Sequence, residues 1–127
     1  MALATKTRII FVMAANEEEA SMIARTLVEE QLAACVNIIS PVRSIYRWQA
    51  KIEESGECLL LIKTSTRNYA RLERRVKDLH SYDVPEIIAM TLAHGSSDYL
   101  KWIAESTGGP AASMKKPLAR RRSPRSA

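Results

Sequence analysis

Residues 9–28 read IIFVMAANEEEASMIARTLV and pass from a strand pattern to a helix pattern. The run from Ile9 to Met13 is apolar and rich in β-forming residues, which is typical of a buried strand. Asn16 is a favourable helix N-cap, and Glu19 stands three positions later, where a capping box places its acid. Apolar side chains then recur at spacings of three and four, at Ala20, Ile23, Ala24, Leu27 and Val28. That spacing predicts a helix with one buried face.

The rest of the chain contains the same unit again, with one more strand between the two. We expect strands over 9–13, 34–48 (with a break or bulge near Pro41), 57–64 and 86–93, and helices that begin near 16, 65 and 96. The pair Ser55-Gly56 is a turn signal and predicts a turn just before the third strand. The order βαββαβ, with an added C-terminal helix, predicts an α+β ferredoxin-like sandwich. In that fold two helices cover one face of a four-stranded antiparallel sheet.

The second predicted strand is longer than the ~5–6 residues of an average strand. Its alternation places Tyr46 and Trp48 on one face and Ile45 and Arg47 on the other. A long unpaired strand is an aggregation hazard, and large aromatic side chains are costly to leave in water. We therefore expect a homo-oligomer in which the overhanging strand completes a sheet between subunits.

The 127 residues carry a net charge of +5, and 46% of them are hydrophobic. This length and apolar share suit one globular domain and exclude a disordered, collagen-like or low-complexity chain. The basic charge is local, because segment 108–127 holds six basic residues and no acid. Removing these six from the 19 Lys and Arg leaves 13 against 14 Asp and Glu in 1–107. We expect a domain over 1–107 and an unstructured tail over 108–127. The tail is either a solubilising end or a non-specific contact with nucleic acid or another acidic partner.

Cysteine use and the apolar runs bear on the cellular compartment. Cys35 and Cys58 lie 23 residues apart without a Cys-x-x-Cys motif. This favours two buried reduced thiols over a disulfide or a metal-binding pair. No apolar run reaches the ~18 residues that a membrane span needs, and residues 1–6 lack the apolar core of a signal peptide. These features predict a cytoplasmic protein without membrane association.

Five short motifs resemble the CutA family of divalent-cation tolerance proteins. They are QLAACVNI at 31–38, SIYRW with KI at 44–52, the strand at 57–64, HSYDVPEI at 80–87 and DYLKWI at 98–103. Together they cover about residues 7–107 with no obvious gap. The resemblance implies a ferredoxin-like protomer assembled as a homotrimer, in which the long hairpin pairs with the neighbouring subunit.

The resemblance implies a role in divalent-cation tolerance, with copper as the ion that gave the family its name. An alternative is a trimeric signalling or interaction scaffold, because the trimer resembles the P-II nitrogen-signalling proteins in architecture. The residues themselves supply no catalytic set: no nucleophile can be paired with a base by motif, and no His-Glu-x-x-His or Gly-rich phosphate loop occurs. We therefore expect no enzymatic activity and no obligatory cofactor.

Two positions depart from the family pattern. Ala50 stands where the family has glycine, which argues against a positive-φ turn there. Ser81 replaces the proline that follows His80 in the family, which would loosen that loop.

The candidate metal ligands are His80 and Cys35. Copper prefers thiolate, thioether and imidazole ligands. The resemblance implies a copper set made of a Cys at the position of Val12 and a His pair at the positions of Leu79 and His80, so only His80 is retained. Cys35 lies among apolar strand residues, which favours packing over metal binding.

The second candidate site is a cleft at a subunit interface. Aromatic and polar side chains of the hairpin and of the loop after His80 would line it: Tyr46, Trp48, Lys63, Tyr82 and Glu86. Lys63 follows an apolar run and could receive an anion, and buried Tyr and Trp side chains need hydrogen-bond partners. The set predicts either a site for a metal ion or small ligand, or hydrogen bonding between subunits alone.

Overall fold

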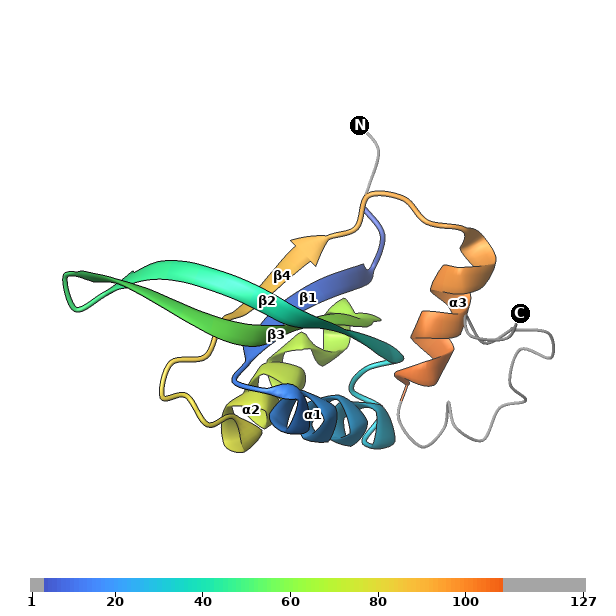
Figure 1. Ribbon diagram of the computed structural model, residues 1–127. Helices are drawn as coiled ribbons and strands as arrows, with labels where there is room; N and C mark the ends of the chain where they lie inside the picture. Colours follow the sequence, from blue (N-terminus) through green and yellow to red (C-terminus); the bar gives the residue numbers. More distant parts are fainter. Residues whose placement is uncertain (1–3, 109–127) are drawn as a thin grey trace, which may run out of the picture.

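The computed structural model describes residues 4–108, which form one four-stranded sheet and three α-helices (Figure 1). In chain order the elements are β1 Thr7–Ala14, α1 Glu17–Glu29, β2 Cys35–Trp48, β3 Lys51–Ser65, the 3₁₀ turn η1 Thr66–Asn68, α2 Tyr69–Leu79, β4 Ile87–Thr91 and α3 Ser97–Ser106. The sheet is antiparallel with the strand order β2-β3-β1-β4. The predicted ferredoxin-like α+β fold is confirmed. Apart from Gly108, the predicted tail lies outside the described residues.

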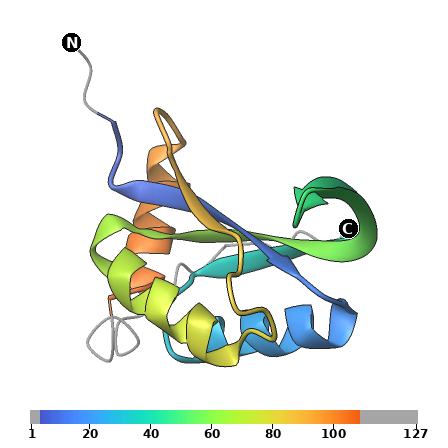
Figure 2. The same ribbon diagram turned by 90° about the vertical axis from the view of Figure 1, so that its left-hand side faces the viewer.

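Helices α1 and α2 cover one face of the sheet, and the core lies between these two layers (Figures 1 and 2). Alternate residues of β1 and β3 point into this core, with Ile10 paired to Ile62 and Val12 paired to Leu60. The helices contribute Ile23, Leu27, Leu72 and Val76, all fully buried. Each such side chain contributes about 1.5–3 kcal/mol by leaving water. This layer fixes the ends of β1 and α2, which lie beside the site described below.

Strands β2 and β3 continue past the rest of the sheet as a long hairpin (Figure 1). β1 pairs only with Cys58–Ser65 of β3, whereas the pairing of β2 with β3 runs on to Trp48 opposite Lys51. The register shifts between Ile39 and Val42, where the sequence predicted a break or bulge. The predicted overhang is therefore present in the single chain.

The hairpin turn is at Gln49-Ala50, and the predicted turn at Ser55-Gly56 is wrong. Gln49 and Ala50 have φ values of 51° and 66°, so the positive-φ turn that Ala50 argued against does form. The left-handed conformation costs an L-residue about 1–2 kcal/mol. The cross-strand pairing of the hairpin compensates for that cost, because beyond the shift it continues without a break from Val42 opposite Glu57 to Trp48 opposite Lys51. Gly56 lies inside β3, opposite Arg43.

Candidate functional site

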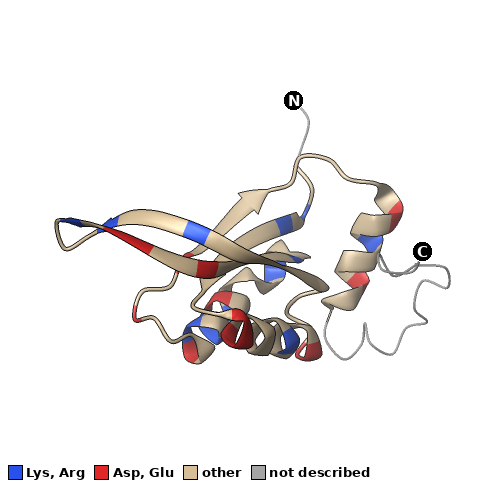
Figure 3. Ribbon diagram, viewed as in Figure 1, with Lys and Arg blue, Asp and Glu red and all other residues tan. Residues whose placement is uncertain are grey.

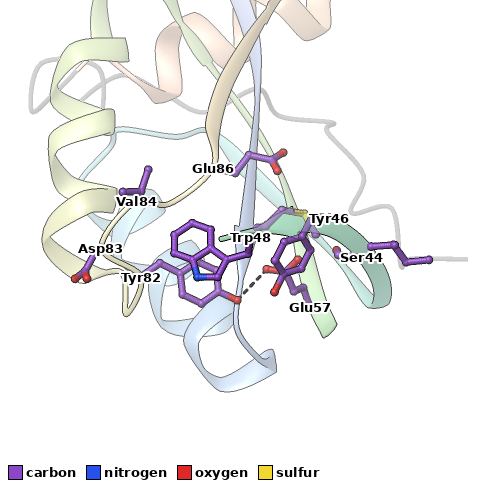
Figure 4. Close-up of a pocket in the computed structure, with 10 residues that line it drawn as sticks. Ser44, Tyr46, Trp48, Glu57, Tyr82, Asp83, Val84 and Glu86 are labelled. Atoms are coloured by element: carbon purple, nitrogen blue, oxygen red, sulfur yellow. Dashed lines mark hydrogen bonds between the residues drawn. The ribbon is translucent and has the colours of Figure 1, made fainter. Parts of the chain in front are cut away.

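A pocket of about 630 Å³ lies between the hairpin and the loop that joins α2 to β4 (Figure 4). Tyr46 and Trp48 come from β2, and alternation along the strand turns both to one side. Tyr82 and Glu86 come from the loop, so four of the five residues predicted for a cleft line this pocket. The motifs at 44–52 and 80–87, far apart in the sequence, thus meet at one site.

Lys63 is the predicted cleft residue that lies elsewhere. It is the cross-strand partner of Cys35, near the end of β3 that is far from the hairpin turn. Its Nζ donates a hydrogen bond to the side-chain oxygen of Asn37. Lys63 therefore serves the β2–β3 pair and supplies no positive charge to the pocket.

Tyr82 and Glu57 are joined by a hydrogen bond across the pocket (Figure 4). The phenol of Tyr82 donates to Oε2 of Glu57 over 2.8 Å. Partial burial, followed by the hydrogen bond and the charge of Glu57, raises the pKa of Tyr82 to about 12. Tyr82 is therefore a neutral donor at physiological pH, and it orients the Glu57 carboxylate against the aromatic rings.

Glu57 and Asp83 are pocket residues that the sequence reasoning missed. Asp83 belongs to the motif at 80–87, so that motif was the available signal. The hairpin turn lies at Gln49-Ala50, so Glu57 is inside β3. The register of the hairpin pairs Glu57 with Val42 and so brings it to the site. Charges of both signs occur along the hairpin (Figure 3), but no lining residue is Lys, Arg or His. With Glu86 the pocket therefore carries three carboxylates and no basic side chain.

His80 caps the end of α2 and anchors the loop that lines the pocket. Its side chain is fully buried, and Nε2 donates to the Met13 carbonyl over 2.6 Å. Nδ1 accepts the N–H of Tyr82 over 3.0 Å, so the ring is the neutral tautomer protonated at Nε2. Both nitrogens are already engaged. Binding a metal ion through His80 would therefore require one of these hydrogen bonds to break.

Glu19 fastens the same loop from α1. Its carboxylate accepts the N–H groups of Ala15 and Ser81, each over 2.8 Å, and lies 3.9 Å from Nδ1 of His80. Burial alone would raise the pKa of Glu19, but the hydrogen bonds from Ala15 and Ser81 outweigh it and lower the pKa. The capping-box acid expected from sequence thus also positions a segment 62 residues further on.

The two candidate metal ligands lie in different parts of the chain. Cys35 pairs with Lys63, whereas His80 contacts Met13, whose cross-strand partner is Leu59. These positions are four residues apart on β3, or about 13 Å. Among residues 4–108 there is no group of three His, Cys, Asp or Glu side chains able to hold a metal ion. Metal binding by His80 or by Cys35 therefore stays a prediction for each residue separately.

Val12 and Leu79, at the positions where the resemblance implied further copper ligands, are apolar. Val12 is fully buried in the core, and Leu79 is partly buried and packs against this core. Cys58 is buried and Cys35 is half-buried, and both thiols are free. The Sγ of Cys58 donates to the hydroxyl of Ser40 over 3.3 Å.

Comparison with known proteins gives one consistent family. The model of the "CutA1 divalent ion tolerance protein" family matches residues 8–106. The "Divalent-cation tolerance protein CutA" of Thermus thermophilus is 50% identical over 100 residues, which cover 79% of this chain and 97% of the relative. The solved structure of Cut A1 from the same organism superposes with a TM-score of 0.79 at 49% identity, over 80% of this chain and 99% of that one.

The predicted cytoplasmic location is corrected by two further relatives. One solved structure, 39% identical over 80% of this chain and 98% of its own, is titled the "Periplasmic divalent cation tolerance protein CutA" of Archaeoglobus fulgidus. A relative from Arabidopsis thaliana, 40% identical over 78% of this chain and 54% of its own length, is named "Protein CutA, chloroplastic". Relatives of this domain are thus named after different compartments, so the residues of the domain do not assign a cellular compartment. None of the helices within residues 4–108 has the length and apolar character to cross a membrane.

Proposed function

This chain belongs to the CutA1 divalent ion tolerance protein family, and we propose that it serves in divalent-cation tolerance as a homotrimer that binds its ligand without catalysis. The observation that carries the proposal is the family match over residues 8–106, which include the hairpin, the pocket and the loop that lines it. The Thermus thermophilus relative has the same extent and bears the same functional name.

Support for the trimer comes from apolar side chains that a single chain leaves in water. On the hairpin face opposite Tyr46 and Trp48, Ile45 and Ile52 are 59% and 65% exposed. On β4, at the opposite edge of the sheet, Ile88 and Met90 are about half exposed. Burying such side chains contributes roughly 25 cal/mol per Å². Neighbouring copies that cover the hairpin would gain this energy and pair its free strand edges.

Support for a ligand site comes from the position of the pocket beside the same hairpin. Glu57, Asp83 and Glu86 place carboxylate oxygens on its walls, and such oxygens suit hard divalent cations. Copper would instead favour the thiol of Cys35 or the imidazole of His80. We place the site in the cleft between subunits, where a neighbouring copy adds the remaining ligands.

The physiological test is growth of a strain that lacks this gene, with and without a plasmid copy, in rising concentrations of copper, zinc and cobalt salts. We expect the deletion to lower the inhibitory concentration of at least one metal and the plasmid to restore it. Equal inhibition of both strains by all three salts would contradict the proposed role.

The oligomer is tested on the full chain by size-exclusion chromatography with light scattering. A mass three times that of the chain is expected, and a stable monomer at micromolar concentration would rule out the trimer. Titration of the same sample with Cu(II) and Zn(II) in a calorimeter reports whether the metal binds the protein directly.

A further inference from the structure

We propose that the pocket binds a small organic cation, a quaternary ammonium or alkylated amine, against the rings of Tyr46, Trp48 and Tyr82. The inference names a ligand class for the site of the proposed function, and it rests on the pocket remaining open in the assembled protein. Its basis is the combination of ring faces, unneutralised carboxylates and size in one cavity.

Three aromatic rings converge on the pocket from two segments of the chain (Figure 4). Tyr46 and Trp48 stand on β2, and Tyr82 faces them from the loop before β4. These three residues are 42%, 56% and 36% exposed, which leaves surface available to a ligand. The faces of Tyr and Trp rings attract a cation that lies within about 6 Å of the ring centre. The methyl groups of an organic cation add apolar contact with such rings.

The charge of the lining has a single sign. Glu57, Asp83 and Glu86 are carboxylates, and no lining residue is basic. Within residues 4–108 none of these three takes part in an ion pair. Glu57 accepts a hydrogen bond from the neutral phenol of Tyr82, which leaves the negative charge of the carboxylate in place. A cleft lined by one sign of charge concentrates the opposite ion.

The dimensions of the pocket favour an organic cation over a bare metal ion. A volume of about 630 Å³ lies in the ~300–1,000 Å³ range of small-molecule sites. A bound Ca²⁺ or Mg²⁺ needs about six or more oxygens at roughly 2.0–2.6 Å from one point. In the described part of the chain no three acidic, His or Cys side chains converge in that way. The carboxylates are instead distributed around the walls, where they suit a diffuse charge on an apolar body, and Met13 and Val84 supply apolar contacts.

The test is calorimetric titration of the full-length protein with choline, and with 3,3-dimethyl-1-butanol as its uncharged analogue of the same shape. We expect saturable binding of choline and at least tenfold weaker binding of the neutral alcohol. This comparison needs no variant. Equal binding of the two compounds, or no binding of choline, would overturn the inference.

Variants then assign the binding to the pocket. Trp48→Ala and Glu57→Gln are each expected to weaken choline binding at least tenfold. Glu54→Gln is the matched control, because Glu54 is an exposed acid of the same strand that pairs with Arg43 and does not line the pocket. Unchanged affinity in both pocket variants would place the binding elsewhere and refute the proposal.

Light scattering and the metal-growth assay distinguish failure of the proposed function from failure of the ligand inference. If the trimer forms and confers metal tolerance but choline does not bind, only the ligand inference fails. If choline binds to a monomer that confers no tolerance, the proposed function fails and the ligand inference stands.

Discussion

Glu19 joins the start of α1 to the pocket loop, two segments that lie far apart in the sequence. Its carboxylate takes the Ala15 N–H at the start of α1 and the Ser81 N–H in the pocket loop, next to the buried ring of His80. Ala15 is half-buried and Ser81 is exposed, and a hydrogen bond to a charged acceptor contributes about 1.5–3 kcal/mol. Glu19 therefore holds the pocket loop against α1, beside the ring of His80.

The first prediction is that Glu19→Gln lowers the free energy of unfolding at pH 7 by about 1–3 kcal/mol, because an amide can accept from only one of the two N–H groups. Urea unfolding at fixed protein concentration measures the loss. Glu18→Gln is the control, since Glu18 is an exposed acid in the same helical turn. Equal stability of the Glu19 variant and the wild type would contradict the role assigned to the carboxylate.

The pH dependence of the same variant has a definite sign. The pKa of Glu19 is lower in the folded protein than its usual value of 4.5, so its contribution is fully present above that value. The contribution is lost as the pH falls through the lowered folded pKa. The stability difference between wild type and Glu19→Gln should therefore be constant from pH 7 to about 5 and shrink below about pH 4.5. A difference that grows on acidification would be inconsistent with this assignment.

The second prediction concerns Tyr82, whose phenol donates to Glu57 and whose pKa is raised to about 12. The raised pKa means that the stabilising contribution of Tyr82 is fully present below about pH 10, the pKa of the unfolded chain. This contribution is lost as the pH rises through about 12. Tyr82→Phe should cost roughly 1 kcal/mol at neutral pH, because the ring is partly exposed.

Ultraviolet titration at the phenolate band checks this prediction. Tyr82→Phe should leave the absorbance rise between about pH 9 and 11 unchanged, because Tyr82 ionises only above that range. The amplitude near pH 12 should fall. A reduced rise between pH 9 and 11 in the variant would show that Tyr82 has an ordinary pKa.

At the scale of the elements, the hairpin turn shows where sequence patterns stop being sufficient. The alternation at 44–48 and the apolar run at 59–62 predicted both strands, because side-chain period reports which face is buried. Glycine is a common turn residue, so Ser55-Gly56 predicts a turn that the structure does not have. The true position of the hairpin turn follows from cross-strand register, a property of two strands together, and it forces Gln49 and Ala50 into positive φ.

The third prediction follows from this strained turn. Ala50→Gly should raise the free energy of unfolding by up to about 1 kcal/mol, because glycine adopts a φ near 66° without a steric cost. The gain is limited because glycine also gives the unfolded chain more conformational entropy. Thermal unfolding at equal protein concentration measures the gain. An unchanged or lower transition temperature would mean that the turn carries no strain.

Gly56→Ala is the opposite substitution in the same hairpin, and it supplies the control. A Cβ added at Gly56 meets no atom within 4 Å, and an alanine inside a strand is favoured over glycine by roughly 0.5–1 kcal/mol. Both substitutions should therefore stabilise, one by adding a glycine and the other by removing one. Destabilisation by Gly56→Ala would refute the position of Gly56 in an open part of β3.

At the scale of the whole molecule, part of the site followed from sequence and part required the fold. Tyr46, Trp48, Tyr82 and Glu86 were found because they cluster in two motifs, and the fold brings the motifs together. The place of Lys63 after an apolar run predicts a site residue, but the strand carries Lys63 to the end of β3 far from the hairpin turn. The acidic character of the pocket required Glu57, whose place depends on the register of the hairpin. The motifs thus predicted the rings and Glu86, and the hairpin register added Glu57.

The hairpin that forms the pocket also presents the most exposed isoleucine among residues 4–108. Ile52 is 65% exposed and pairs with Arg47, on the face opposite Tyr46 and Trp48. If a neighbouring copy covers this face, Ile52→Lys places a charge in an apolar contact, which costs several kcal/mol. The fourth prediction is that the oligomer of this variant dissociates at a protein concentration at least tenfold higher than that of the wild type. Light scattering over a dilution series measures this concentration.

Met22→Lys is the matched control for Ile52→Lys, because Met22 is an exposed apolar residue on the outer side of α1, away from the hairpin. It should leave the oligomer intact, since the same charge then enters water and not an interface. Dissociation by both variants would point to net charge as the cause, and dissociation by neither would remove Ile52 from the interface. Dissociation by Ile52→Lys alone would tie assembly to the same hairpin whose other face holds the aromatic rings, so that oligomer and pocket depend on one element.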